Sequence, residues 1–210
     1  MRVRVLGLMG GLVVLSACGA RDDAMPQRPA APPAANATQV AAALRQGGLV
    51  LFFRHAATDR GRDDASQVRI EDCATQRVLS AAGQAQARAI GAGLARLRIP
   101  IGEVRASPYC RCADTARLAF DYVLLDDDLL PLRDGDAAAH LAAVRRLLST
   151  PPIPGTNVAL VGHGDTIEKL AGFELDEGEA AIARPAVGGG SFTLVGRIRA
   201  DHWDAIAVAR

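Results

Sequence analysis

The sequence predicts an α/β fold, a three-layer α/β/α sandwich around a mainly parallel central sheet. Two short apolar runs, residues 49–53 and 158–161, are typical of strands buried on both faces, and residues 104–107 are expected to form another short strand between them. Stretches with apolar residues at helical spacing separate these runs. Strands that alternate with helices favour a parallel sheet covered by helices on both sides.

The predicted helices begin and end at residues that commonly cap helices. Residues 38–46 form the first, with Thr38 as its N-cap and a pair of glycines after its end. Residues 80–97 form the longest, which Ser80 can cap. Further helices are expected over residues 110–120, 137–148 and 166–171, a last strand over residues 191–198 and a final turn over residues 201–203.

Residues 1–17 have the pattern of an export signal. Arg2 and Arg4 precede an apolar run over residues 5–15, which is too short to span a bilayer as a stable helix. The run ends in Leu-Ser-Ala-Cys, which resembles the bacterial lipobox. We therefore expect cleavage before Cys18 and lipidation of Cys18, the alternative being an ordinary signal peptide with a chance cysteine there.

A lipid on Cys18 would anchor the protein to the cell envelope, facing the periplasm, and Gly19 after it favours the outer membrane. Residues 18–37 are rich in proline and alanine and are predicted to be an extended tether. The folded domain is then expected over residues 38–210. Half of the residues are hydrophobic, enough for a sizeable core, and the formal net charge of +1 gives no sign of a nucleic-acid partner.

Two of the four histidines directly follow predicted buried strands. Arg54 and His55 follow the first strand, His163 follows the third, and Arg111 begins the helix after the second. Ligands of open α/β sheets bind at the carboxyl ends of the strands, so these side chains are expected to meet there. Guanidinium groups match phosphoryl oxygens, and an imidazole kept neutral by nearby cations can be a nucleophile. The pattern predicts a site for phosphoryl transfer.

Four segments in this order resemble the motifs of the histidine phosphatase superfamily, also called phosphoglycerate-mutase-like. They are residues 51–58 with the Arg-His pair, 79–91 with a Leu-Ser-x-x-Gly helix start, 107–116 with a Ser-Pro and a second arginine, and 161–164 with the second histidine. The motifs extend over roughly residues 48–196, nearly the whole predicted domain.

The resemblance implies a phosphatase with the phosphoglycerate-mutase-like fold. His55 would be the nucleophile that becomes phosphorylated, while Arg54, Arg111 and His163 would bind the phosphoryl oxygens. The resemblance implies no metal and no cofactor, since arginines carry the positive charge. The expected partner is a small phosphorylated substrate or a phosphoprotein, that is, a phosphomonoester or a phosphohistidine.

The resemblance leaves the identity of the general acid open. Asp134 is favoured because the family has a carboxylate between the second arginine and the second histidine in one of its branches; Asp136 and Asp165 are the alternatives. Ala56 and Ala57 depart from the family's usual glycine and, in many mutases, glutamate. The competing hypothesis is a non-catalytic envelope lipoprotein that binds an anionic, phosphorylated ligand.

Three cysteines remain after the predicted signal and Cys18: Cys73, Cys110 and Cys112. In an oxidising compartment two of them are candidates for a disulfide. Cys110 and Cys112 are too close along a helix start to pair easily, so a bond from Cys73 to one of them is expected. Cys110 is favoured because Cys73 opens the segment that leads to the Leu-Ser-x-x-Gly helix of the resemblance. The alternative is that all three are free thiols.

Overall fold

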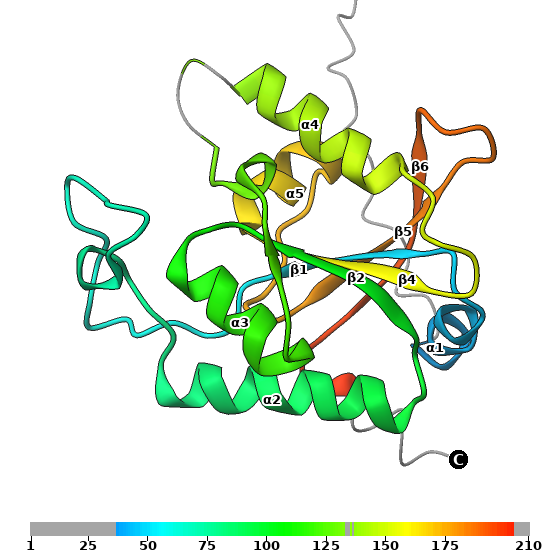
Figure 1. Ribbon diagram of the computed structural model, residues 1–210, viewed down its shortest axis with the longest axis horizontal. Coiled ribbons are helices and arrows are strands. Elements are labelled where there is room, and N and C mark those ends of the chain that lie inside the picture. The colour runs from blue at the N-terminus through cyan, green and yellow to red at the C-terminus, as the bar shows by residue number, and fades with distance from the viewer. Residues whose placement is uncertain (1–36, 133–134, 136, 204–210) are drawn as a thin grey trace, which may run out of the picture.

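The computed structural model describes residues 37–132, 135 and 137–203 (Figure 1). The predicted signal, Cys18 and nearly all of the tether lie outside the described residues, as do Asp134 and Asp136. Within the described part, no helix is long and apolar enough to cross a membrane. The helices are α1 (Ala37–Gln46), α2 (Ala81–Arg96), α3 (Cys110–Phe120), α4 (Ala137–Ser149) and α5 (Gly164–Ala171), and the strands are β1 (Val50–Arg54), β2 (Ile101–Ala106), β3 (Leu124–Leu125), β4 (Asn157–Gly162), β5 (Ala180–Pro185) and β6 (Phe192–Ile198).

The strands form one sheet in the order β3-β2-β4-β1-β5-β6. The first four are parallel, as the alternation of strands and helices predicts, and β5 and β6 add an antiparallel edge. The sequence analysis missed β5, because its residues are Ala-Ala-Ile-Ala-Arg-Pro and alanine does not favour strands. Pairing with the buried strand β1 holds it extended all the same. Strand β3 was not predicted either, because it has only two residues.

Helices cover both faces of the sheet, which confirms the three-layer sandwich (Figure 1). Side chains of β1 point alternately to the two sides. Leu51 and Phe53 pack into the core under α1, α2 and α3, whereas Val50 and Phe52 pack into the core under α4 and α5. All four are at most 1% exposed, so β1 is a central strand as its continuous apolar run predicts.

Two predicted helix starts were tested by the structure with different results. Ser80 caps α2 as expected, since its Oγ accepts a hydrogen bond from the backbone N–H of Gly83 at 3.0 Å. Thr38 is not an N-cap, because α1 begins at Ala37 and Thr38 lies inside its first turn. The last helix before β5 begins at Gly164, two residues earlier than predicted, with His163 in the N-cap position.

Candidate active site

The two predicted site histidines follow neighbouring parallel strands. Arg54, the last residue of β1, is the register partner of Gly162, the last residue of β4. His55 and His163 therefore follow the two strands at the same edge of the sheet. The backbone N–H of His55 also donates to the carbonyl of Gly162 at 3.0 Å. The centres of the two imidazole rings are 5.8 Å apart. Parallel pairing therefore brings together residues that are more than a hundred positions apart in the chain.

A cavity of about 290 Å³ lies at this edge of the sheet. It gathers the four predicted phosphoryl-binding and nucleophilic side chains, together with residues that the sequence analysis did not select for the site. Its lining consists of Arg54, His55, Arg77, Arg111, Pro131, His163, Gly164, Asp165, Glu168 and Glu174.

A larger hollow of about 630 Å³ lies beside β2, β3 and α4. No histidine lines it, and its arginines are already paired with carboxylates, Arg105 with Asp126 and Arg146 with Asp128. We therefore place the chemistry in the smaller cavity, where cations and histidines converge.

His55 is held as a neutral imidazole. The residue is 3% exposed, and its Nδ1 lies 2.9 Å from the carbonyl oxygen of Ala56. Because a carbonyl only accepts hydrogen bonds, Nδ1 carries the ring proton, which leaves the lone pair on Nε2. The pKa of His55 is lowered from 6.5 to about 4, mainly by burial and also by the charges of Arg111 and Arg54, against the opposing effect of the Ala56 hydrogen bond.

His163 is positioned by contacts on two sides. Its Nε2 lies 3.1 Å from the hydroxyl of Ser107, and the ring of Tyr109 packs edge-on against it at 5.3 Å. The ring is 5% exposed. Burial, followed by the charge of Arg111, lowers the pKa of His163 well below its usual value. This imidazole is therefore also neutral near pH 7.

The two predicted arginines each have a carboxylate partner. Arg54 Nη1 donates to Glu174 Oε1 at 3.1 Å and to the carbonyl of Leu175 at 2.6 Å. Arg111, the second residue of α3, donates from Nη1 to Asp64 Oδ1 at 3.0 Å. The Nε atoms of both arginines are buried and have no hydrogen-bond partner among the described residues. Both guanidinium groups thus keep donor capacity for a ligand.

Arg77 is a third arginine of the cavity, and the sequence analysis missed it. Within the part of the chain that the structure describes, no carboxylate pairs with its guanidinium, and its Nε is buried without a partner. The sequence holds 23 arginines, so an arginine alone is a weak signal. The available signal was its place two residues before the Leu-Ser-x-x-Gly segment.

The carboxylates around the cavity bear on the choice of a general acid. Both oxygens of Asp165 accept backbone N–H bonds, one from Leu132 at 3.0 Å and one from Thr166 at 2.8 Å. Glu174 lines the cavity but is paired with Arg54. Asp134, the favoured acid, lies outside the described residues, so its role stays a prediction.

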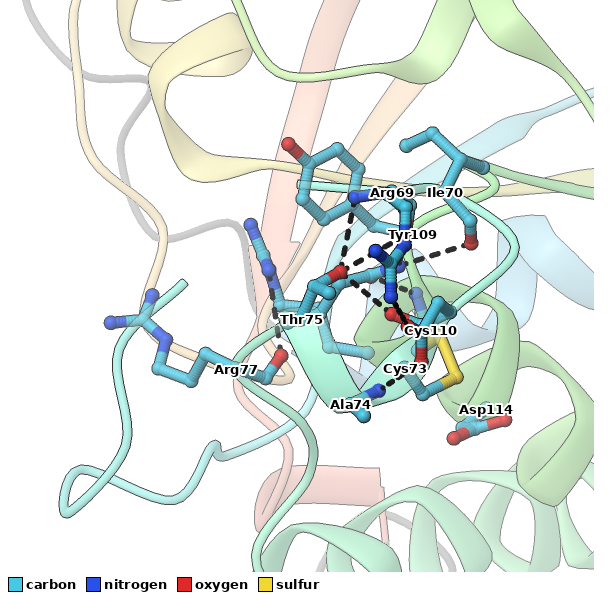
Figure 2. The surroundings of a disulfide bond; sticks show 12 residues. Arg69, Ile70, Cys73, Ala74, Thr75, Arg77, Tyr109, Cys110 and Asp114 are labelled. Atoms are coloured by element: carbon cyan, nitrogen blue, oxygen red, sulfur yellow. Dashed lines mark hydrogen bonds and ion pairs between the residues drawn. A yellow bond between two sulfur atoms is a disulfide. The ribbon is translucent and has the colours of Figure 1, made fainter. Parts of the chain in front are cut away.

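The favoured disulfide is confirmed, because Cys73 and Cys110 are bonded (Figure 2). Figure 2 shows the bond joining the loop before α2 to the first residue of α3, with Arg77 extending away from the sulfur atoms. Cys112 is a free thiol, 3.6 Å from His163 Nε2. Burial raises the pKa of Cys112 to about 12, so this thiol stays protonated and is not a nucleophile.

Comparison with known proteins points to one superfamily. Residues 50–129 match the family model of the histidine phosphatase superfamily, branch 1. No curated protein matches the sequence. Similar solved structures include the protein histidine phosphatase SixA complexed with tungstate, at 19% identity and a TM-score of 0.52 over 73% of this chain and 98% of that one.

Two further structures have the same fold at similarly low sequence identity. A phosphoserine phosphatase variant from Entamoeba histolytica, in complex with phosphoserine, is 14% identical with a TM-score of 0.54, over 73% of this chain and 98% of that one. Mycobacterial hydrolase 1 is 17% identical with a TM-score of 0.50, over 70% of this chain and 96% of that one. At these identities the likeness establishes the shared fold.

Proposed function

We propose that this chain, a member of the histidine phosphatase superfamily, is a metal-independent phosphatase that forms a phosphohistidine on His55. The substrate is a phosphomonoester or a phosphohistidine. The observation that carries the proposal is the neutral, buried imidazole of His55 in a cavity lined by three arginines. A histidine that only bound an anion would bind better protonated, whereas a nucleophile needs the free lone pair.

The reaction follows from the proton on Nδ1 of His55. Nε2 attacks phosphorus, the bond from phosphorus to the leaving group breaks, and the leaving group takes up a proton. The carbonyl of Ala56 accepts the Nδ1 hydrogen bond and so stabilises the positive charge that develops on the ring. Water then gives a proton to the deprotonated general acid and attacks phosphorus, the phosphorus–nitrogen bond breaks, and inorganic phosphate leaves with His55 restored.

The cations supply the charge that the transferring group needs. Arg54, Arg111 and Arg77 would donate to its oxygens, where negative charge is spread in the transition state. The Ser107 hydroxyl accepts from the backbone N–H of Tyr109, so its proton is free for Nε2 of His163. That bond places the proton of His163 on Nδ1, which can donate to the phosphoryl group.

Asp134 remains the proposed general acid for the leaving group. Both Asp165 oxygens already accept backbone N–H hydrogen bonds, and this supports Asp134 over Asp165 because the Asp165 carboxylate is engaged in holding the backbone. Replacing Asp134 by Asn should slow the hydrolysis of alkyl phosphates more than that of aryl phosphates, whose leaving groups need less protonation.

The test is hydrolysis of an aryl phosphate by the purified protein with a chelator present, beside His55→Ala and the exposed control His202→Ala. Activity that survives the chelator, vanishes in His55→Ala and persists in His202→Ala supports the proposal. A folded wild-type protein that binds inorganic phosphate without hydrolysing any phosphate ester would support the competing hypothesis, an envelope lipoprotein that binds an anionic ligand.

Two similar structures carry names that suggest substrates to try first: phosphoserine, held by the Entamoeba phosphatase, and phosphohistidine, from the name of SixA. The panel therefore sets phosphoserine and other small phosphomonoesters against a protein phosphorylated on histidine. The ratio of their kcat/KM values decides between a small substrate and a phosphoprotein.

We also propose that the protein is a periplasm-facing lipoprotein anchored through Cys18, the outer membrane being favoured. The order of charge, apolar run, small residues and cysteine supports this. Wild-type protein should fractionate with membranes and carry acyl chains by mass spectrometry. Cys18→Ala should abolish both, and soluble wild-type protein without acyl chains would refute the anchor.

A further inference from the structure

One carboxylate connects two arginine positions of the cavity. Asp64 lies in the loop between β1 and α2, and its Oδ1 accepts from Nη1 of Arg111 at 3.0 Å. The same oxygen accepts from the backbone N–H of Arg77 at 2.7 Å. Nη1 of Arg111 also lies 3.5 Å from the carbonyl of Arg77. Asp64 thus joins the loop that carries Arg77 to the side chain of Arg111.

The guanidinium of Arg111 lines the cavity and is held through one of its nitrogens. The ring of Tyr109 lies 4.4 Å from its Cζ, and Asp64 holds Nη1. Nε is buried with no partner among the described residues. Asp64 therefore fixes Nη1, while Nε belongs to the guanidinium edge with Nη2 that can bind two phosphoryl oxygens side by side.

The loop that carries Asp64 is itself fixed to α3. Cys73 is bonded to Cys110, the residue before Arg111 (Figure 2). Gln76 is fully buried, and its Oε1 accepts from the backbone N–H of Cys110 at 2.8 Å, in the first turn of α3. The N-cap residue Tyr109 makes no side-chain capping bond, so Gln76 supplies one from the loop.

We propose that Asp64 is a positioning residue that orients Arg111 for the phosphoryl group, with the disulfide and Gln76 holding its loop in place. The proposal rests on the proposed function, in which Arg111 binds the phosphoryl oxygens. Asp64 acts through Arg111 and does not touch the reacting atoms.

Asp64 has two opposed effects on anion binding. Its negative charge repels a phosphate dianion, but its side chain is 32% exposed, so solvent screens that repulsion. Its hydrogen bond removes the rotational freedom of a long side chain before the ligand arrives. We expect the gain from positioning to outweigh the screened repulsion.

The test compares Asp64→Ala, Asp64→Asn and the matched control Asp63→Asn, the neighbouring exposed aspartate. Asp64→Ala should raise both KM for an aryl phosphate and Kd for inorganic phosphate about tenfold, with kcat changed less. Asp64→Asn keeps an oxygen that can accept both hydrogen bonds, so its effect should be smaller. Asp63→Asn should leave all three constants unchanged.

A double-mutant cycle separates positioning from a merely structural role. If Asp64 acts through Arg111, Asp64→Ala should have no further effect on phosphate affinity once Arg111 is Met. An equal loss in both backgrounds, or an unchanged or tighter phosphate affinity in Asp64→Ala, would overturn the proposal.

Calorimetric binding of inorganic phosphate keeps the test independent of turnover. If the wild type binds phosphate without hydrolysing esters, the proposed function fails while the Asp64 variants still decide this proposal. If the wild type binds no phosphate at all, both proposals fail.

Discussion

The candidate site is built from two regions that are stabilised in different ways. His55 and His163 follow buried, hydrogen-bonded strands, so the hydrophobic core fixes them. Arg77 and Asp64 belong to a largely polar loop whose residues 59–67 are mostly exposed. That loop is fixed by a disulfide, by Gln76 and by an ion pair to α3. The core thus holds the nucleophile, and the bonded loop organises part of the positive charge.

Because the two regions are stabilised differently, we expect substitutions in the loop and substitutions in the core to have different effects. A change in the loop should weaken phosphate binding while the sheet stays folded. A change at the strand ends should stop the chemistry even where the substrate still binds.

The largest effect in this comparison is expected at Arg111, where the two regions meet. Arg111→Met should lower kcat/KM by about 100- to 1,000-fold, because the transition state loses a fixed charged donor. The control is Arg117→Met on the same helix, whose side chain is 53% exposed and paired with Asp114. Equal kcat/KM values for the two variants would exclude Arg111 from the reaction.

The next effect is expected from opening the disulfide. Cys73 and Cys110 are 37 positions apart, and a bond over such a loop contributes about 3 to 4 kcal/mol through the unfolded state. The Cys73→Ser/Cys110→Ser variant should lose about that much stability in urea titrations and should have a raised KM. A reductant should reproduce both changes in the wild type and change nothing in the variant. A variant with unaltered KM would show that the loop needs no covalent bond.

A smaller effect, on the stability of the folded protein, is expected from the neutral imidazole of His55. The pKa of His55 is 6.5 in the unfolded chain and about 4 in the folded protein. Between these values the unfolded chain takes up a proton that the folded protein does not, so stability falls as pH falls. At pH 4 the loss attributable to His55 is about 3 kcal/mol.

Urea titrations of wild type and His55→Gln between pH 7 and pH 4 measure this difference. The wild type should lose more stability than the variant over this range, because only the wild type has an imidazole whose protonation is suppressed by folding. Parallel loss in both proteins would contradict a neutral, buried His55.

The sequence predicted the central part of the fold and site because one physical pattern decides it. Continuous apolar runs predict β1 and β4, and polar residues directly after such runs can lie only at the edge of the sheet. The strand β5 was missed because alanine-rich residues become a strand only by pairing with β1. Its position therefore depends on a contact that no local pattern encodes.

The loop side of the site was beyond sequence reasoning for a related reason. Arg77 is one of many arginines and Asp64 is one of many acidic residues, and no periodicity in the sequence distinguishes either of them. Their positions follow from the Cys73–Cys110 bond and the Gln76 hydrogen bond, which are long-range contacts. Separation along the chain favoured Cys73 as one partner of a disulfide, and the place of Cys73 at the start of the segment leading to the family helix favoured Cys110 as the other.

The most direct test of the account is to trap the phosphorylated enzyme. The protein is mixed with an aryl phosphate, quenched with alkali within one turnover, digested and analysed by mass spectrometry. We predict an acid-labile, alkali-stable phosphoryl group on the peptide that contains His55, absent in His55→Ala. Turnover by the wild type with no phosphopeptide at any quench time, together with retained activity in His55→Ala, would contradict the account.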